Sequence, residues 1–133
     1  NVFGEELMVE NADKALSKAC SLTQTEVIDY TVAPIFMDGK AKGAHEWIIE
    51  FRENPLDVEE FSRILDIELQ AINSDYEAKR YNNMTLNPLV LNLARPNLFY
   101  DWLKDRGKLG GQHKIPRLSN TREYVEQLKE LSL

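Results

Sequence analysis

The sequence has little of several features that each mark a class of protein. Among its 133 residues there is one cysteine, Cys20, which excludes an internal disulfide and fits a reducing compartment, so we expect a cytoplasmic protein. No apolar run approaches the roughly 18 residues that a transmembrane helix needs. The formal net charge is -6, whereas nucleic acids and anionic membranes bind positive surfaces. We therefore expect neither of them as a partner.

Short motifs of self-contained active sites are missing as well. The P-loop has Ser or Thr after its lysine, whereas Ile115 follows Lys114 and the preceding glycines have a different spacing. His45 and His113 lie far apart, and neither has a partner at the short spacing of a zinc site. The Gly-x-Ser-x-Gly elbow of serine hydrolases does not occur. The sequence thus predicts no complete nucleotide site and no metal site.

The length of the chain indicates one domain. With 133 residues, 43% of them hydrophobic and 29% charged, it can bury one core and is too short for two ordinary domains. It begins at Asn1 without a methionine, and residues 1–4 have the character of a strand end or linker that enters a helix. We interpret residues 1–133 as a single domain of a longer protein.

Hydrophobic periodicity predicts both helices and strands. The expected helices cover 5–22, 57–72, 97–107 and a last stretch from 120 onward, and the expected strands cover 26–37, 46–52 and 89–93. Residues 76–87 show no such pattern and are expected to be irregular. Pro34 cannot donate to a ladder, which predicts a bulge or a sheet edge there. The order α-β-β-α-β-α-α indicates an α+β fold, with a small, mostly antiparallel or mixed sheet of three to four strands flanked by helices.

Polar residues mark the starts of the later helices. Asp57 with Glu60, and Asn120 with Glu123, have the spacing of a capping box, and Asn97 is of a type that caps helices. The strand over 46–52 alternates apolar with charged residues around one additional isoleucine. We interpret the excess of acidic residues in the chain as solvated surface.

Glycine and positive charge are concentrated in one segment of this acidic chain. Residues 106–117 contain four Lys/Arg and no Asp/Glu, with glycines at 107, 110 and 111. Glycine gives the backbone access to φ > 0, and Pro116 stiffens the chain two residues after Lys114. This pattern predicts a loop that meets an anion, with Lys114 as the held cation.

Four segments of the chain resemble the C-terminal domain of the auxin-responsive acyl-acid amido synthetases. They are Phe3-Gly4-Glu5-Glu6-Leu7, His45-Glu46-Trp47, Asn73-Ser74-Asp75-Tyr76-Glu77-Ala78-Lys79-Arg80 and Gly110-Gly111-Gln112-His113-Lys114-Ile115-Pro116-Arg117. The last two are the specific ones, and the resemblance spans nearly the whole chain. It is closer to bacterial than to plant members, and residues 96–99 depart from the usual glycine before Thr-Phe.

The resemblance implies an adenylate-forming ligase of the luciferase-like type. In that family a larger N-terminal domain binds ATP, Mg²⁺ and a carboxylic acid, and the smaller C-terminal domain closes over it as a mobile cap. The carboxylate attacks the α-phosphate of ATP to give acyl-adenylate and pyrophosphate, and an amine, here expected to be an amino acid, then displaces AMP to form an amide. The lysine matching Lys114 is expected to reach the ATP or acyl-adenylate phosphate, while the residues expected to shape or position the loop are Gly110, Gly111, Gln112, His113, Arg117, Glu5 and Glu6.

Other interpretations of these residues stay open at this point. Glu5 and Glu6 could complement a helix N-terminus or face the missing domain. Tyr76 and Arg80 are interpreted as structural, His45 as a hydrogen-bonded residue at a strand start, and Cys20 as a small core residue. The whole chain could also be a noncatalytic binding module whose basic loop docks a phosphorylated or acidic partner. A single-stranded nucleic-acid binder is disfavoured because the aromatic residues lie at core periodicities.

Overall fold

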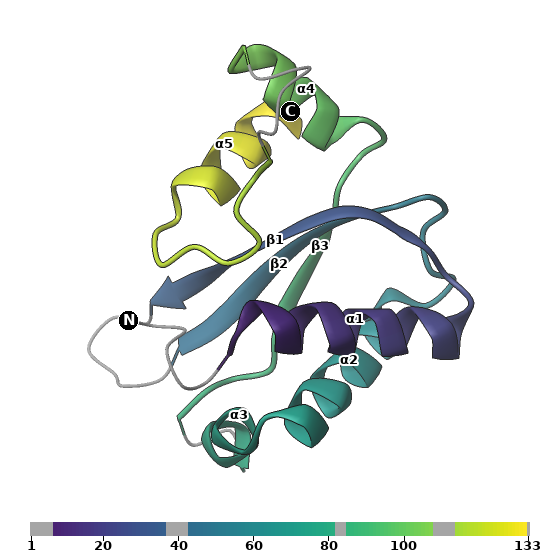
Figure 1. The fold of residues 1–133 in the computed structure, drawn as a ribbon, viewed down its shortest axis with the longest axis vertical. Coiled ribbons are helices and arrows are strands. Elements are labelled where there is room, and N and C mark those ends of the chain that lie inside the picture. Colours follow the sequence, from purple (N-terminus) through teal and green to yellow (C-terminus); the bar gives the residue numbers. More distant parts are fainter. Residues whose placement is uncertain (1–6, 37–42, 82–84, 108–113, 133) are drawn as a thin grey trace.

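The structure is a computed structural model that describes residues 7–36, 43–81, 85–107 and 114–132. These residues form five helices and three strands (Figure 1). Their order is α1 (Val9–Thr23), β1 (Val27–Phe36), β2 (Gly43–Phe51), α2 (Val58–Ile72), α3 (Ser74–Arg80), β3 (Val90–Leu93), α4 (Leu98–Asp105) and α5 (Glu123–Ser132). The predicted α+β class is confirmed, with α3 as an additional helix. No helix in the described ranges has the length and apolar character needed to cross a membrane.

The sheet is mixed and has helices on both faces. Its strand order is β1-β2-β3, with β1 antiparallel and β3 parallel to β2. Figure 1 shows α1, α2 and α3 on one side of the sheet and α4 and α5 on the other. The central strand β2 therefore sends Trp47 and Ile49 into one apolar cluster and Ile48 into the other. The charged positions that alternate with them also lie inside the protein, and Glu46 and Glu50 are each only 3% exposed.

Strand β1 forms one edge of the three-stranded sheet, as the proline in it predicted. Pro34 itself stays in register opposite His45, and the ladder is interrupted between Val27 and Asp29 instead. The residue at that interruption, Ile28, is exposed. Pro34 is thus tolerated because it lies on an edge strand, and the bulge that releases Ile28 lies elsewhere.

The prediction of irregular structure over 76–87 was wrong for residues 76–80, which belong to α3. The helix is specified by its start, because the Asn73 side chain accepts a hydrogen bond from the Tyr76 N–H at 3.0 Å. Tyr76 is the buried residue of α3. A seven-residue helix with one buried side chain has no apolar stripe, so periodicity could not reveal it.

The capping predictions had mixed outcomes. Asp57 caps α2 as predicted, and its carboxylate accepts the Glu60 N–H at 3.0 Å. The last helix begins at Glu123, whose N–H lies 3.5 Å from Thr121 Oγ1. Because a cap lies directly before the first helical residue, Asn120 is not the cap of α5.

Asn97 occupies the N-cap position of α4, as predicted, but its side chain does not cap the helix. Asn97 has a left-handed backbone, with φ of 67°, and its side chain makes no capping hydrogen bond. The buried carboxylate of Glu50 on β2 accepts the N–H groups of Asn97 at 2.9 Å and Phe99 at 3.4 Å. A negative charge at a helix N-terminus is favourable, so the cap of α4 comes from the sheet below it.

Candidate functional site

The structure describes two of the residues that the sequence placed in a functional site, Lys114 and Arg117. The other six lie outside the described residues, namely Glu5, Glu6, Gly110, Gly111, Gln112 and His113. Their predicted roles in shaping and positioning the loop stay predictions. The site is therefore built from the segment that begins at Lys114.

Lys114 is exposed and stands directly before a residue that is fixed in the core. Its neighbour Ile115 is only 3% exposed and belongs to the apolar cluster that also contains Trp102 and Val125, from α4 and α5. The chain thus changes from surface to core within one residue. The backbone at Lys114 is therefore held next to the core.

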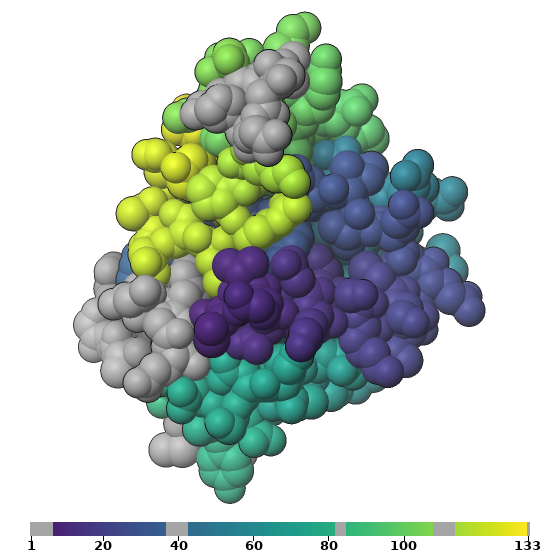
Figure 2. Space-filling model, in the orientation of Figure 1, coloured from purple at the N-terminus to yellow at the C-terminus, as the bar shows by residue number. Residues whose placement is uncertain are grey.

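The residues after Ile115 are tied to the outer edge of β1. Thr31 Oγ1 donates to the Pro116 carbonyl at 2.6 Å, the Val32 N–H donates to the Arg117 carbonyl at 2.8 Å, and the Ser119 N–H donates to the Val32 carbonyl at 3.0 Å. Figure 2 shows the resulting proximity, with the yellow-green segment before α5 lying beside the purple α1. The polypeptide after Lys114 therefore extends the sheet by a short run of hydrogen bonds along β1.

The Arg117 side chain fixes this segment a second time. Its guanidinium forms an ion pair with the Asp29 carboxylate, donates to the Tyr30 carbonyl at 3.0 Å and lies 4.8 Å from the centre of the Tyr30 ring. The side chains of Arg117 and Asp29 are 31% and 24% exposed, so the pair is only partly shielded from water. We call Arg117, Asp29 and Tyr30 together the Arg117 anchor.

Tyr30 connects the Arg117 anchor to helix α1 and to the core. Its hydroxyl donates to the Asp13 carboxylate of α1, and its ring stacks on Trp47 with centroids 5.4 Å apart. Burial and then the Asp13 carboxylate raise the pKa of the Tyr30 phenol above its ordinary value. The phenol therefore stays protonated at neutral pH and keeps donating to Asp13.

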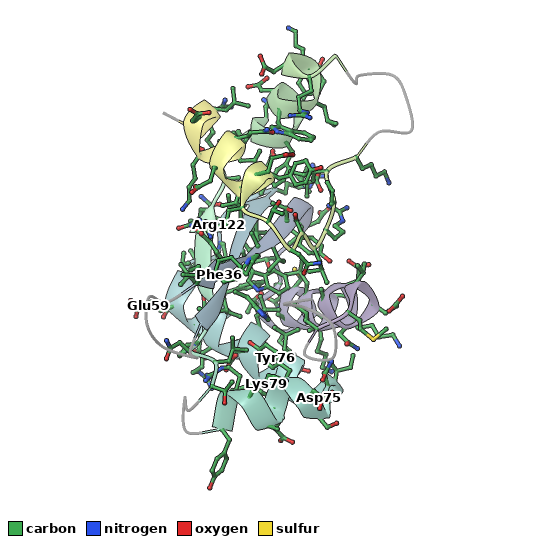
Figure 3. All side chains as sticks on the ribbon, turned by 90° about the vertical axis from the view of Figure 1, so that its left-hand side faces the viewer. Phe36, Glu59, Asp75, Tyr76, Lys79 and Arg122 are labelled. Carbon is green, nitrogen blue, oxygen red and sulfur yellow. The ribbon has the colours of Figure 1, made fainter. Side chains whose placement is uncertain are left out.

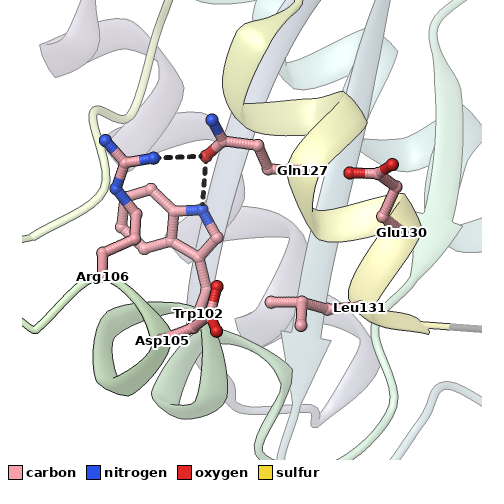
Figure 4. A pocket seen from close by; sticks show the side chains of 6 residues that line it. All are labelled: Trp102, Asp105, Arg106, Gln127, Glu130 and Leu131. Atoms are coloured by element: carbon pink, nitrogen blue, oxygen red, sulfur yellow. Dashed lines mark hydrogen bonds between the residues drawn. The ribbon is translucent and has the colours of Figure 1, made fainter.

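Two hollows on the described surface lie away from Lys114. One, of about 280 Å³, lies between α4 and α5, where Gln127 Oε1 accepts hydrogen bonds from Trp102 Nε1 at 2.8 Å and Arg106 Nη1 at 2.9 Å (Figure 4). The other, of about 540 Å³, lies between α2 and β3. Neither hollow has Lys114 or Arg117 in its lining.

Tyr76 and Arg80, which we interpreted as structural, meet at a buried carboxylate. Asp66 accepts from the Tyr76 hydroxyl at 2.6 Å, and from Arg80 Nε and Nη2, both at 2.8 Å. Arg80 Nη1 also donates to the Leu86 carbonyl at 3.2 Å, which holds the chain before β3. We call Asp66, Tyr76 and Arg80 the Asp66 cluster. Figure 3 shows that Tyr76 is well separated from Arg122 near α5.

A second buried carboxylate, Glu46, ties β2 to α5. Arg122 Nη2 and Lys129 Nζ each approach its oxygens to 2.7 Å, and Asn92 Nδ2 donates to it as well. Burial alone would raise the pKa of Glu46, but the hydrogen bonds from Lys129 and Arg122 outweigh burial and hold the pKa below its ordinary value. The sequence alternation did not reveal this network, because the partners of Glu46 come from distant elements.

His45 and Cys20, which the sequence indicated as structural residues, both pack against the core. The His45 side chain is buried, 1% exposed, with its ring centre 6.0 Å from that of Tyr76. Cys20 is partly buried against the cluster beneath α1 and α2, and burial raises the pKa of its thiol. A raised pKa lowers the thiolate fraction at neutral pH, in agreement with the interpretation of Cys20 as a core residue.

The described residues include an exposed cation, Lys114, and no metal centre. In the ranges that the structure covers, no group of three or more His, Cys, Asp or Glu side chains is placed to hold a metal. Lys114 is instead an exposed ammonium at the end of a fixed support. Such a group can approach an anion on another surface.

The sequence matches the pattern described as the GH3 family C-terminal domain, over residues 10–123. The chain belongs to the GH3 family. The match confirms the resemblance to acyl-acid amido synthetase C-terminal domains seen in the motifs. No curated protein matches the sequence.

Solved structures of the same family share the fold. A GH3.15 acyl acid amido synthetase superposes with a TM-score of 0.72 and 20% identity over 93% of this chain. AtGH3.15 acyl acid amido synthetase in complex with 2,4-DB gives a TM-score of 0.68 and 19% identity, also over 93%. This GH3 chain spans 23% and 24% of those two proteins, or about a quarter of their length.

Proposed function

We propose that this GH3 chain is the C-terminal, mobile cap domain of an ATP-dependent acyl-acid amido synthetase. Such an enzyme adenylates a carboxylic acid and transfers the acyl group to an amine, which we take to be an amino acid. The observation that carries the proposal is the exposed Lys114 in a GH3 C-terminal domain, rooted beside the buried Ile115. The domain would supply this lysine as it closes over the rest of the enzyme.

The remaining part of the enzyme would hold the substrates. The two solved acyl acid amido synthetases are about four times as long as this chain, which covers 23% and 24% of them. ATP, Mg²⁺ and the carboxylic acid would bind in the N-terminal domain that accounts for the difference. Lys114, which is exposed on this domain, would complete that site.

The proposed chemistry has two steps with different electrostatic needs. In the first, a carboxylate oxygen attacks the α-phosphorus of ATP and the bond to pyrophosphate breaks. Negative charge then collects on the α-phosphoryl oxygens, and an ammonium group delivered into a water-poor site stabilises that charge more strongly than in the ground state. In the second, the amine nitrogen attacks the acyl carbon, AMP leaves with the bonding electron pair, and the amine loses a proton. Lys114 can withdraw between the two steps, which makes room for the amine.

The test measures pyrophosphate release by the full-length enzyme that carries this domain, with ATP, Mg²⁺ and panels of carboxylic and amino acids. We expect acid-dependent release that falls by about 10²- to 10³-fold in Lys114→Ala, the usual loss when one preorganised contact to a developing anion is removed. Lys104→Ala, which removes an exposed lysine on α4, is the matched control and should retain wild-type rates.

Two results would contradict the proposal. Release that does not depend on any carboxylic acid would argue against the ligase and for a noncatalytic module. Acid-dependent release that is the same in Lys114→Ala and Lys104→Ala would keep the ligase and remove the role of Lys114.

A further inference from the structure

Few backbone contacts fix the register of the segment after Lys114 against β1. The segment makes one bridge to β1, between Val32 and Leu118. A strand held by so few backbone bonds can shift along its neighbour, and a one-residue shift turns every side chain to the opposite face. For this segment such a shift would remove Ile115 from the core and move Lys114 with it.

Arg117 prevents that shift because its side chain contacts two successive residues of β1. Its guanidinium pairs with the Asp29 carboxylate and donates to the Tyr30 carbonyl at 3.0 Å, while its carbon lies 4.8 Å from the centre of the Tyr30 ring. A planar guanidinium that makes several directed contacts fixes a position better than a lysine could. The Arg117 anchor therefore sets the register of the segment.

The position of Arg117 is transmitted to Lys114 over a short distance. Three residues of extended chain span about 10 Å at most. One of the residues between them, Ile115, is buried and the other, Pro116, has a restricted φ and a carbonyl held by Thr31. Little slack is left between the anchor and the lysine.

The anchor is itself held from behind by helix α1. The Tyr30 hydroxyl donates to Asp13 of α1, and the Tyr30 ring stacks on Trp47 at 5.4 Å. Both contacts fix the ring beneath the Arg117 guanidinium. The segment that follows Lys114 is thus connected through Tyr30 to α1 and β2 as well as to β1.

We propose that Arg117 and Asp29, with Tyr30 beneath them, are positioning residues that set where Lys114 meets the acyl-adenylate phosphate. This inference rests on the proposed function. A misplacement of about 1 Å in a catalytic group can cost about 10²-fold in rate. Loss of the anchor should therefore lower kcat for adenylation and leave substrate binding, which lies elsewhere in the enzyme, nearly unchanged.

The experiment compares Arg117→Met, Asp29→Asn and the double variant in the full-length enzyme. We expect kcat for acid-dependent pyrophosphate release to fall by about 10- to 100-fold in each single variant, with the KM values for ATP and acid within about threefold of wild type. The double variant should be no worse than Arg117→Met, because the two residues act as one unit. Arg117→Lys keeps the charge but loses the fork, and its kcat should lie between wild type and Arg117→Met.

The matched control is Arg52→Met, which removes an arginine from an exposed pair with Glu26 on the same hairpin. It should keep the wild-type kcat. Amide hydrogen exchange adds a readout that does not depend on activity. In Arg117→Met, exchange at Val32 and Ser119, which donate across the β1 edge, should accelerate relative to Arg52→Met.

The results separate this inference from the proposed function. Full activity and unchanged exchange in Arg117→Met, beside an inactive Lys114→Ala, would overturn the anchor alone. A kcat loss that only follows the fraction of unfolded enzyme would also overturn it. A wild-type enzyme without acid-dependent pyrophosphate release would overturn the proposed function and, with it, any positioning role in that reaction.

Discussion

The domain contains two groups of arginine, aspartate and tyrosine that differ in how far they are closed to water. In the Asp66 cluster the arginine and aspartate side chains are 9% and 10% exposed, and the carboxylate accepts from both the tyrosine and the arginine. In the Arg117 anchor the corresponding side chains are 31% and 24% exposed, and the tyrosine hydroxyl donates to a different carboxylate, that of Asp13. The first group is a closed unit between helices, and the second stands beside an exposed lysine.

The difference in exposure predicts different roles for the two groups. Removing one member of a closed ion pair leaves a buried charge without compensation, which costs much stability. Removing one member of a partly exposed pair lets water replace it at a smaller cost. We therefore expect the Asp66 cluster to be felt mainly in stability and the Arg117 anchor mainly in rate.

The largest expected effect on stability is that of Asp66→Ala. The variant leaves the Arg80 guanidinium buried without its carboxylate, and we expect a loss of about 3–5 kcal/mol in the free energy of unfolding. Chemical denaturation of the 133-residue chain measures it, with the exposed Asp75→Ala on α3 as the control. Equal losses in the two variants would contradict the structural role of the cluster.

Acid should lower the stability that the buried carboxylates of Asp66 and Glu46 give to the fold. Burial alone would raise the pKa of Asp66, but hydrogen bonds from Arg80 and Tyr76 outweigh burial and lower that pKa, as happens for Glu46. A carboxyl whose pKa is lower in the folded state stabilises the fold above its unfolded pKa, near 4, and this contribution is lost as the pH falls through the folded pKa. The free energy of unfolding should thus be flat from pH 7 to about 5 and fall below pH 4.

The same pH series tests one carboxyl by itself. Glu46→Gln cannot titrate at that position, so its unfolding free energy should fall less steeply below pH 4 than that of the wild type. Glu53→Gln, at an exposed site, should keep the wild-type slope. A Glu46→Gln slope equal to that of wild type would show that Glu46 has the same pKa in both states.

A smaller loss is expected where the sheet caps a helix. Glu50→Gln retains an acceptor but removes the charge that faces the N–H groups of Asn97 and Phe99 at the start of α4. Capping contacts contribute about 0.5–2 kcal/mol, so a loss of about 1 kcal/mol is expected by thermal or chemical unfolding. A loss no larger than that of the exposed control Glu53→Gln would contradict the assignment of Glu50 as the cap.

The smallest effect on stability is expected for Arg117→Met. Arg117→Met should cost about 1 kcal/mol or less, because roughly a third of the side chain is already in water. Its kcat in the full-length enzyme should nevertheless fall. A stability loss as large as that of Asp66→Ala would show that the Arg117 anchor stabilises the fold as strongly as the Asp66 cluster does.

Much of this fold could be predicted from the sequence because its elements bury apolar stripes. Helices α1 and α2 and the hairpin of β1 and β2 have the expected periodicity, and Asp57 caps α2 as predicted. Helix α3 escaped prediction because a cap and a buried carboxylate specify it, without an apolar stripe. The cap of α4 escaped for a related reason, since Glu50 lies 47 residues before the N–H group that it accepts at 2.9 Å.

The candidate site was predictable only in part. Lys114 was visible from the contrast of glycine and positive charge with the acidic chain and from the family motif. The pair of Arg117 and Asp29 was not visible, because Asp29 lies 88 residues before Arg117. Ordinary strand residues surround Asp29 in the sequence. A short-range pattern cannot show that two such distant residues form a pair.

The role of Lys114 in adenylation is tested most directly by separating the two half-reactions of the full-length enzyme. Single-turnover formation of acyl-adenylate and aminolysis of a preformed acyl-adenylate would be measured for wild type and Lys114→Ala. We predict that formation slows by about 10²- to 10³-fold in the variant, while aminolysis stays within about threefold of wild type. Equal losses in both steps, or no loss in formation, would contradict a lysine that this domain delivers for adenylation.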